Sequence, residues 1–204
     1  MRPRVRELAF TLLLLAGCVS NRVDRAPLSW PQQQALLSEL REYGLDGRVG
    51  VRVGEEGWQA NARWRQRNEL AEVELSGPFG AGSMLLRLTG DELQVVDSKG
   101  GILRGDEALN AMVMQLGFAP PLTSLRHWLL GLPDPAGGEP VVVPNVDGTL
   151  AELQQSGWRL LYEDYGVQST AAATVRMPGK VTATRENIRL RLVVDRWRLK
   201  PGLK

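Results

Sequence analysis

Short runs of alternating apolar and polar residues make up most of this chain. In the run WQANARWRQ, Trp58 and Trp64 share one face with the two alanines between them. Such a two-residue period is typical of a β-strand with one buried face. The runs are 47–53, 58–66, 70–76, 83–89 and 92–98, followed later by 149–155, 158–165, 173–185 and 188–197. Because short turns separate most successive runs, the pattern predicts an antiparallel meander.

Three other segments have helical spacing. Ser29 can cap a helix over 30–43 that ends at Gly44, and two further helices are predicted over 105–117 and 121–133. The apolar stripes are Leu109, Met112, Val113 and Leu116 in the second helix, and Leu122, Leu125, Trp128 and Leu129 in the third. Short apolar helices must cover the apolar face of an antiparallel sheet. The pattern therefore predicts a mainly β (α+β) protein, with helices covering one curved sheet around an apolar interior.

Length and charge limit the class of protein. A chain of 204 residues with 43% hydrophobic content is expected to form one domain with a sizeable core. Its net charge of +2 comes from residues 1–17, where Arg2, Arg4 and Arg6 outnumber Glu7 by two. The neutral remainder argues against a nucleic-acid partner and against a polybasic membrane patch. Any membrane contact is then expected to depend on apolar groups or on a covalent lipid.

The N-terminus has the features of a secretory signal. A basic start precedes an apolar run, 8–16, that is too short to span a bilayer as a helix. The run leads into LAGC, which resembles the lipobox of bacterial lipoprotein precursors and would make Cys18, the only cysteine, the lipidated residue. In such precursors cleavage occurs before the cysteine. We therefore predict a signal peptide over 1–17, a flexible tether over 18–29 and a single domain over 30–204.

The residue after the cysteine bears on the location of the protein. In the lipoprotein precursors of enteric bacteria, an Asp in this position favours retention in the inner membrane. Here the position holds Val19, which favours export. The predicted location is the periplasmic face of the outer membrane, with a lipid anchor at Cys18. The alternative is an ordinary signal peptide with an incidental cysteine.

The sequence contains no recognisable catalytic constellation. His127 is the only histidine, and Cys18 is assigned to lipidation, so no Cys/His pair remains. Metal binding would need clustered His, Cys or carboxylate ligands, and no such spacing occurs. We predict that the protein is not an enzyme and has no catalytic residue, metal or cofactor. A lipid-processing hydrolase that uses His127 is a weaker alternative.

The turn SGPFGAGS, residues 76–83, places an aromatic side chain where a turn is normally polar. Pro78 stiffens this turn and Gly80 permits its geometry, with Phe79 at the tip. The alternative is that Phe79 folds back onto the edge of the sheet. The six tryptophans also allow two interpretations, because they suit either a packed core or the wall of a lipid-binding cavity.

Several stretches resemble the LolB family of outer-membrane lipoproteins. They are the lipobox at Cys18, Trp30, RWRQ with Trp64, GPFG at 77–80, LQVVDSKG at 93–100, PLTSLRHWLLGLP at 121–133, SGWRLLYEDY with Trp158, and VDRWRLK with Trp197. The resemblance implies an open antiparallel β half-barrel with helices covering its apolar concave face. It also implies that Phe79 holds the place of an exposed apolar residue, usually leucine, that delivers cargo into the bilayer.

The resemblance further implies a cavity for acyl chains and a set of partners. The candidate wall residues are Trp64, Trp128, Trp158, Leu109, Met112 and Leu125. The partners would be a LolA-type periplasmic carrier, acylated lipoprotein cargo and outer-membrane lipid. A monomeric receptor would accept lipoproteins from the carrier and insert them into the inner leaflet of the outer membrane. The alternative is a structural scaffold lipoprotein with a filled core.

Overall fold

The computed structural model describes residues 28–77, 83–96, 100–169 and 173–200, apart from the side chain of the last of these. Cys18, Pro78, Phe79 and Gly80 were assigned roles from the sequence and lie outside the described residues. Their roles therefore stay predictions. In the described part of the chain, no helix is long and apolar enough to cross a membrane.

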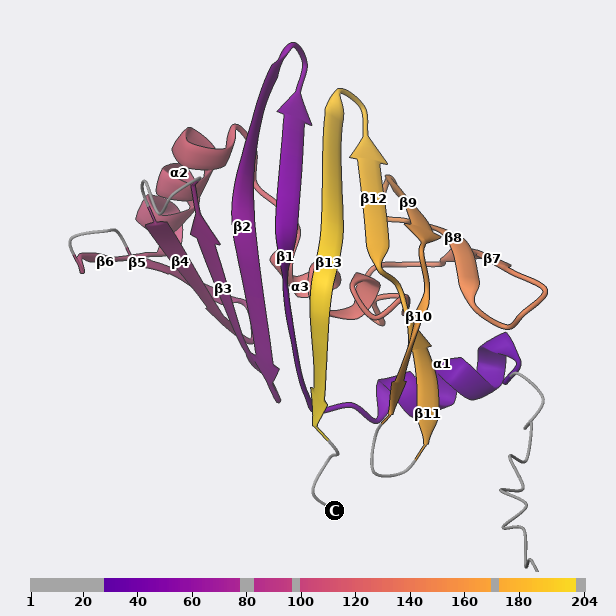
Figure 1. Cartoon of the computed structure of the whole chain (residues 1–204). Helices are drawn as coiled ribbons and strands as arrows, with labels where there is room; N and C mark the ends of the chain where they lie inside the picture. Colours follow the sequence, from indigo (N-terminus) through magenta and orange to yellow (C-terminus); the bar gives the residue numbers. More distant parts are fainter. Residues whose placement is uncertain (1–27, 78–82, 97–99, 170–172, 201–204) are drawn as a thin grey trace, which may run out of the picture.

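Most of the described chain forms one open antiparallel sheet. Its eleven strands follow the order β6-β5-β4-β3-β2-β1-β13-β12-β9-β8-β7 (Figure 1). They are β1 (Glu42–Val53), β2 (Glu56–Arg67), β3 (Leu70–Ser76), β4 (Ser83–Thr89), β5 (Glu92–Val96), β6 (Ile102–Arg104), β7 (Val141–Pro144), β8 (Leu150–Gln155), β9 (Trp158–Glu163), β12 (Lys180–Arg185) and β13 (Ile188–Lys200). A second sheet pairs β10 (Gly166–Ser169) with β11 (Thr174–Met177). The predicted antiparallel meander is confirmed.

The helices lie against this sheet in different places. Within the described residues they are α1 (Trp30–Ser38), α2 (Gly105–Leu116) and α3 (Leu122–Trp128). Figure 1 shows α3 behind the long central strands and α2 behind the edge formed by β5 and β6. The first helix packs beside β11. The prediction of a mainly β half-barrel with helices on its apolar face is confirmed.

A bulge bends the long central strands. The register between β1 and β13 shifts between Asp46 and Gly47, which leaves Asp195 without an opposite residue. A Cβ atom on Gly47 would lie 2.3 Å from the carbonyl oxygen of Val193, so the close approach of the two strands requires glycine. Since a bulge bends its strand and increases the local twist, it helps to curve the sheet.

The first helix is shorter than the sequence pattern predicted. It ends at Ser38, whereas Tyr43 and Gly44 belong to β1. The ring of Tyr43 is buried, with its centroid 6.4 Å from that of Trp197. The Tyr43 hydroxyl donates a hydrogen bond to the carbonyl oxygen of Arg126. Because tertiary packing fixes Tyr43 in a strand, it overrides the helical spacing of the sequence.

The apolar stripe of α2 is rotated relative to the prediction. Ala108, Met112 and Leu116 are buried, whereas Leu109 is 42% exposed and Val113 is 39% exposed. The second helix packs on β5 and β6 at one edge of the sheet. This narrow support covers only one side of the helix, so part of the apolar surface stays open to solvent.

The sequence pattern missed the shortest strands and merged two others. Strands β6, β7 and β10 have only three or four residues, too few to show an alternation. The predicted strand 173–185 is divided into β11 and β12 at Pro178 and Gly179. The Pro178 carbonyl accepts a hydrogen bond from Trp197 Nε1 at 2.9 Å. A Cβ atom on Gly179 would lie 2.4 Å from the carbonyl oxygen of Asp164, so glycine is required there.

Candidate functional site

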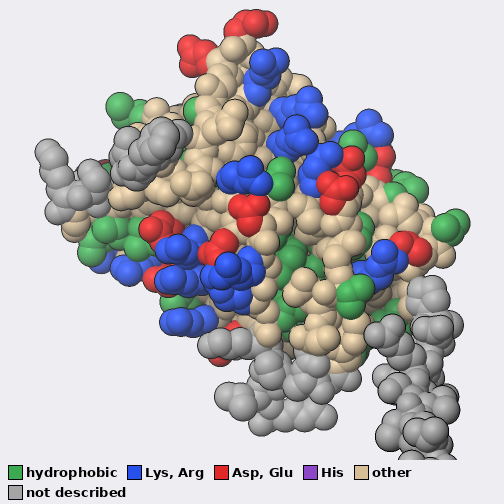
Figure 2. Space-filling view, in the orientation of Figure 1, with side chains coloured by type: hydrophobic (Ala, Val, Ile, Leu, Met, Phe, Trp, Pro, Cys, Tyr) green, Lys and Arg blue, Asp and Glu red, His purple; other side chains and the backbone are tan. Residues whose placement is uncertain are grey.

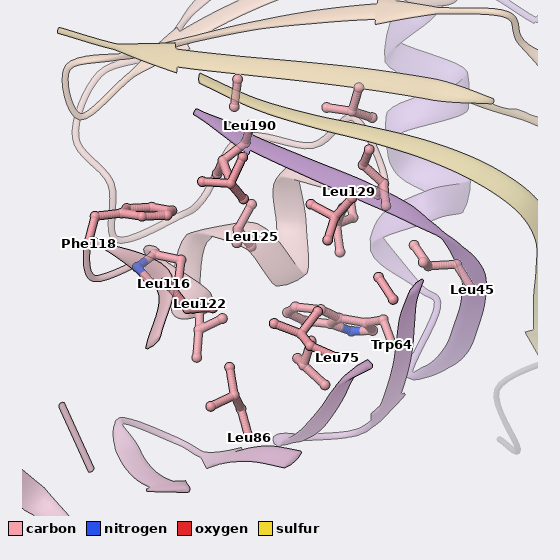
Figure 3. Close-up of a pocket in the computed structure, with 18 of the residues that line it drawn as sticks. Leu45, Trp64, Leu75, Leu86, Leu116, Phe118, Leu122, Leu125, Leu129 and Leu190 are labelled. Carbon is pink, nitrogen blue, oxygen red and sulfur yellow. The ribbon is translucent and has the colours of Figure 1, made fainter. Parts of the chain in front are cut away.

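An apolar cavity lies between the sheet and the segment that contains α3. Its volume is about 110 Å³, and every residue that lines it is apolar (Figure 3). The sheet contributes Leu45, Val49, Val51, Trp58, Ala62, Trp64, Val73, Leu75, Leu86, Val181, Ala183, Leu190 and Leu192. The cover consists of Leu116, Phe118, Pro120, Leu122, Leu125 and Leu129. The cavity therefore joins two parts of the chain that are distant in sequence.

The alternation of the strands produces the sheet side of this cavity. Alternate residues on a strand point to the same face, so Trp58, Ala62 and Trp64 of β2 all reach the cavity. The two indole N–H groups are satisfied locally. Trp58 Nε1 donates to the carbonyl oxygen of Leu116 at 3.2 Å, and Trp64 Nε1 donates to Gln66 Oε1 at 3.3 Å. These bonds leave the cavity wall without a free indole donor.

The chemistry of the wall selects the kind of ligand. A wall of Leu, Val, Ala, Trp, Phe and Pro side chains has no group that could fix a polar ligand. It suits hydrocarbon, which gains from leaving water in proportion to the apolar area buried. The volume of about 110 Å³ is below the roughly 300–1,000 Å³ typical of ligand pockets. An acyl chain would therefore need the cover to move outward.

Three contacts attach α3 to the hairpins beside it. Arg126 Nη1 lies 3.1 Å from Glu69 Oε2, which follows β2. Arg126 Nη2 donates to the carbonyl oxygen of Gly90 at 2.8 Å. The carbonyl oxygen of Arg126 accepts the bond from Tyr43, and burial raises the pKa of that tyrosine well above its ordinary value. These contacts, which we call the Arg126 clasp, hold the cover against the sheet.

The C-terminal end of α3 is fixed by a buried polar cluster. Trp128 Nε1 donates to Gln155 Oε1 at 2.9 Å, and the same oxygen accepts the Asp134 N–H at 2.8 Å. Gln155 Nε2 donates to the carbonyl oxygens of Asp134 and Gly138, both at 2.8 Å. Tyr162 donates to the carbonyl oxygen of Trp128 at 3.0 Å. This end of the helix is thus bonded to β8 and β9.

The six candidate wall residues do not come together at one place. Trp64 and Leu125 line the cavity, on the sheet side and on the cover. The rings of Trp128 and Trp158 pack together with centroids 6.4 Å apart, in the core beyond the cavity wall. Met112 is buried beneath α2, and Leu109 lies on the exposed side of that helix. A role of these four in cargo binding stays a prediction.

The sequence analysis missed most of the sheet side of the wall. Leu190 and Leu192 alternate along β13, and that alternation was visible in the sequence. The alternation that places Trp58 on the same face as Trp64 was also visible in the sequence. Phe118 had none, because it follows the left-handed Gly117 that ends α2 and belongs to no periodic segment.

In the part of the chain that the structure describes, the His127 side chain forms no hydrogen bond or ion pair that would activate it for catalysis. Its imidazole is half-buried, and burial lowers its pKa below the ordinary value, with a smaller opposing effect of Asp134. Asp134 Oδ2 accepts the Ser124 hydroxyl at 2.7 Å, and Oδ1 accepts the Ala136 N–H at 2.9 Å. Among the described residues, no group of three or more His, Cys, Asp and Glu side chains is placed to hold a metal ion.

An open antiparallel half-barrel with an apolar cavity is a scaffold suited to holding hydrocarbon chains. A model of the family "Outer membrane lipoprotein LolB" matches residues 41–197. The chain belongs to the LolB family. Membership makes it a receptor in lipoprotein localisation, on the periplasmic side of the outer membrane, and not an enzyme. It also implies interaction with a LolA carrier and with lipoprotein cargo.

Full-length relatives support this assignment, and a solved structure shares the fold. An outer-membrane lipoprotein LolB of Nitrosococcus oceani is 33% identical over 202 residues, covering 96% of this chain and 98% of the relative. An outer-membrane lipoprotein LolB of Chromohalobacter salexigens is 36% identical over 191 residues, covering 91% of this chain and 86% of the relative. A LolA superfamily protein from Nitrosomonas europaea is similar in fold alone, with a TM-score of 0.52 at 10% identity over 87% of this chain and 96% of that one.

Proposed function

We propose that the mature protein is a monomer anchored through a lipid on Cys18. Removal of 1–17 would leave 18–29 as the tether and 30–204 as one receptor domain. The support is the lipobox in the sequence and the position of α1, which begins at Trp30 and packs on the domain. Burial of several acyl chains, at about 0.8 kcal/mol per methylene, would hold the protein at the membrane.

We further propose that the apolar cavity receives the acyl chains of the cargo. The observation that carries this proposal is the wholly apolar wall between sheet and cover. Acyl chains from the carrier would displace the cover, 116–129, from the sheet and take its place against the wall. Because the cover refills the cavity when the cargo leaves, the receptor exchanges one apolar contact for another. Such an exchange keeps the net affinity moderate and permits release.

Release would take place beside Phe79. The connection between β3 and β4 carries this residue, and its neighbours Ser76 and Ser83 lie opposite each other at the end of the sheet. Burying a phenylalanine contributes roughly 1.5–3 kcal/mol. That energy is too small for an anchor, but it suffices to direct a tethered domain toward the inner leaflet of the outer membrane.

A transfer assay tests the proposal. A periplasmic carrier loaded with a labelled lipoprotein would be mixed with the purified receptor, and liposomes would then be added. Wild type should take the label and pass it to liposomes. Phe79→Glu should take the label but release it slowly. Val146→Glu is the matched control, since Val146 is fully exposed in the turn between β7 and β8, and it should behave like wild type.

The alternatives predict different results in the same assay. A scaffold lipoprotein with a filled core would take no label from the carrier, and this outcome would sink the receptor mechanism. A hydrolase that depends on His127 would lose its function in His127→Ala. The proposed receptor should transfer the label normally with that substitution, because His127 is absent from the cavity wall.

A further inference from the structure

Arginines gather on the outer face of the three longest strands. In β2 and β13 they alternate with residues such as Trp64 and Leu190, which face the cavity, so the arginines point away from it. Figure 2 shows Lys and Arg side chains gathered over the central strands. The arginines are Arg48, Arg52, Arg63, Arg65, Arg67, Arg189, Arg191, Arg196 and Arg198, and the same strands hold only Glu42, Asp46, Glu56 and Asp195. The outer face of these strands is therefore basic, although the total charge of the chain is nearly balanced.

These arginines differ in whether a carboxylate neutralises them. Arg48, for example, lies 2.8 Å from Asp195. In contrast, Arg52, Arg189 and Arg191 form no ion pair with any residue that the structure describes. Arg52 and Arg189 also stand directly opposite each other in the register of β1 and β13. Like charges in opposite positions destabilise a sheet, and a bound anion would relieve that repulsion.

The three arginines surround a hollow with a floor of glycine. Gly50 and Gly57 line it, and its volume is about 650 Å³. Glu55 is the only acidic residue in the lining, so the lining holds three arginines and one carboxylate. A guanidinium group donates two parallel hydrogen bonds to a phosphate and is the side chain best suited to that anion. The charge and the donors of the hollow therefore fit a phosphate group.

The hollow lies at the end of the sheet from which the β3–β4 connection leaves. Ser76, the last residue of β3, lies opposite Asn61 of β2. Gln59, two residues from Asn61 on the same face, lines the hollow. The connection itself carries Phe79, for which we proposed contact with the bilayer. Apolar groups at the acyl boundary together with arginines at the level of the phosphates are typical of an interfacial membrane contact.

We propose that the hollow of Arg52, Arg189 and Arg191 binds the phosphates of anionic phospholipid headgroups during cargo release. The inference rests on the proposed function, since it needs this end of the sheet to approach the bilayer. Each arginine near an anionic surface contributes about a fivefold preference for it. Three of them give a contact that orients the receptor without anchoring it.

The test uses the complete mature chain with Cys18→Ser, so that no acyl chain masks weak binding. Co-sedimentation would compare phosphatidylcholine vesicles with and without phosphatidylglycerol, at low and high salt. Binding should require phosphatidylglycerol and weaken with salt. The variant R52Q/R189Q/R191Q should bind on the order of 100-fold less, because three roughly fivefold preferences multiply. The control R65Q/R67Q/R196Q removes the same charge from arginines of the same face that likewise form no ion pair with a described residue, and it should bind nearly as wild type does.

Three results would overturn the inference. Equal loss in both triple variants would assign vesicle binding to total charge and not to the hollow. Tight calorimetric binding of inorganic phosphate, without a preference for phosphatidylglycerol, would assign the hollow to a soluble anion. In the transfer assay, normal release by R52Q/R189Q/R191Q would refute the hollow while the receptor function stood. Failure of wild type to accept label would instead refute the proposed function.

Discussion

At the scale of single residues, the width of the cavity depends on small side chains in its wall. Ala62 lines the cavity, and its neighbour Asn61 is exposed on the outer face of the same strand. Ala62→Leu should weaken binding of an apolar fluorophore or an acylated peptide several-fold, because the added carbons occupy a cavity of about 110 Å³. Asn61→Leu places a leucine on the outer face, where it cannot occupy the cavity, and should change little. Fluorescence titration of both variants measures the difference, and equal affinities would rule out the cavity as the binding site.

Gln155 is a buried polar residue whose loss should strongly affect stability. It is 3% exposed. Its amide oxygen accepts hydrogen bonds from Trp128 and Asp134, and its amide nitrogen donates to Asp134 and Gly138. Gln155→Leu would leave buried donors and acceptors unpaired and should lower the free energy of unfolding by about 2–4 kcal/mol. Gln154→Leu, next to it and exposed, is the control and should cost less than about 0.5 kcal/mol. Urea denaturation distinguishes the two.

At the scale of elements, the Arg126 clasp sets how readily α3 leaves the sheet. Its guanidinium bonds join Glu69 and Gly90, and its side chain is only 12% exposed. Arg126→Met keeps the apolar stem and removes about 1 kcal/mol of closing energy, which raises the open population roughly fivefold. Stopped-flow binding of an apolar fluorophore should become faster in proportion. The control is Arg87→Met, which breaks the pair with Glu72 on the outer face; an equal acceleration there would contradict the clasp.

The elements also show how far the sequence could predict the fold and the site. Two-residue alternation identified the long strands because each has one face on the core and one in water. It failed for β6, β7 and β10, which are too short to have a period. The stripe of α2 was misplaced because the sequence does not reveal which neighbours a helix will meet. Trp128 and Trp158 were assigned to the cavity through the resemblance to the LolB family, whereas their positions depend on contacts between segments distant in sequence.

At the scale of the whole molecule, the sheet and the cover are expected to respond differently to cargo. The sheet is a continuous ladder, and β1 is paired along its length with β2 and β13. The cover, 116–129, contacts it through apolar side chains, the Arg126 clasp and hydrogen bonds at its two ends, at the Leu116 carbonyl and around Trp128. Opening the cover breaks few backbone hydrogen bonds, while opening the sheet breaks many. The molecule should therefore admit an acyl chain by moving its cover while the sheet stays intact.

Hydrogen exchange with an acylated peptide tests this division. When the peptide binds, amides of α3 should exchange faster because the helix is displaced, and amides of β1, β2 and β13 should keep their slow exchange. Ala62→Leu, with its narrowed cavity, should show a smaller change at the same peptide concentration. Faster exchange confined to the edge strands β6 and β5 would mean that the ligand enters by opening the sheet edge. The cover would then be a fixed part of the core, and cargo release would have to be sought at that edge.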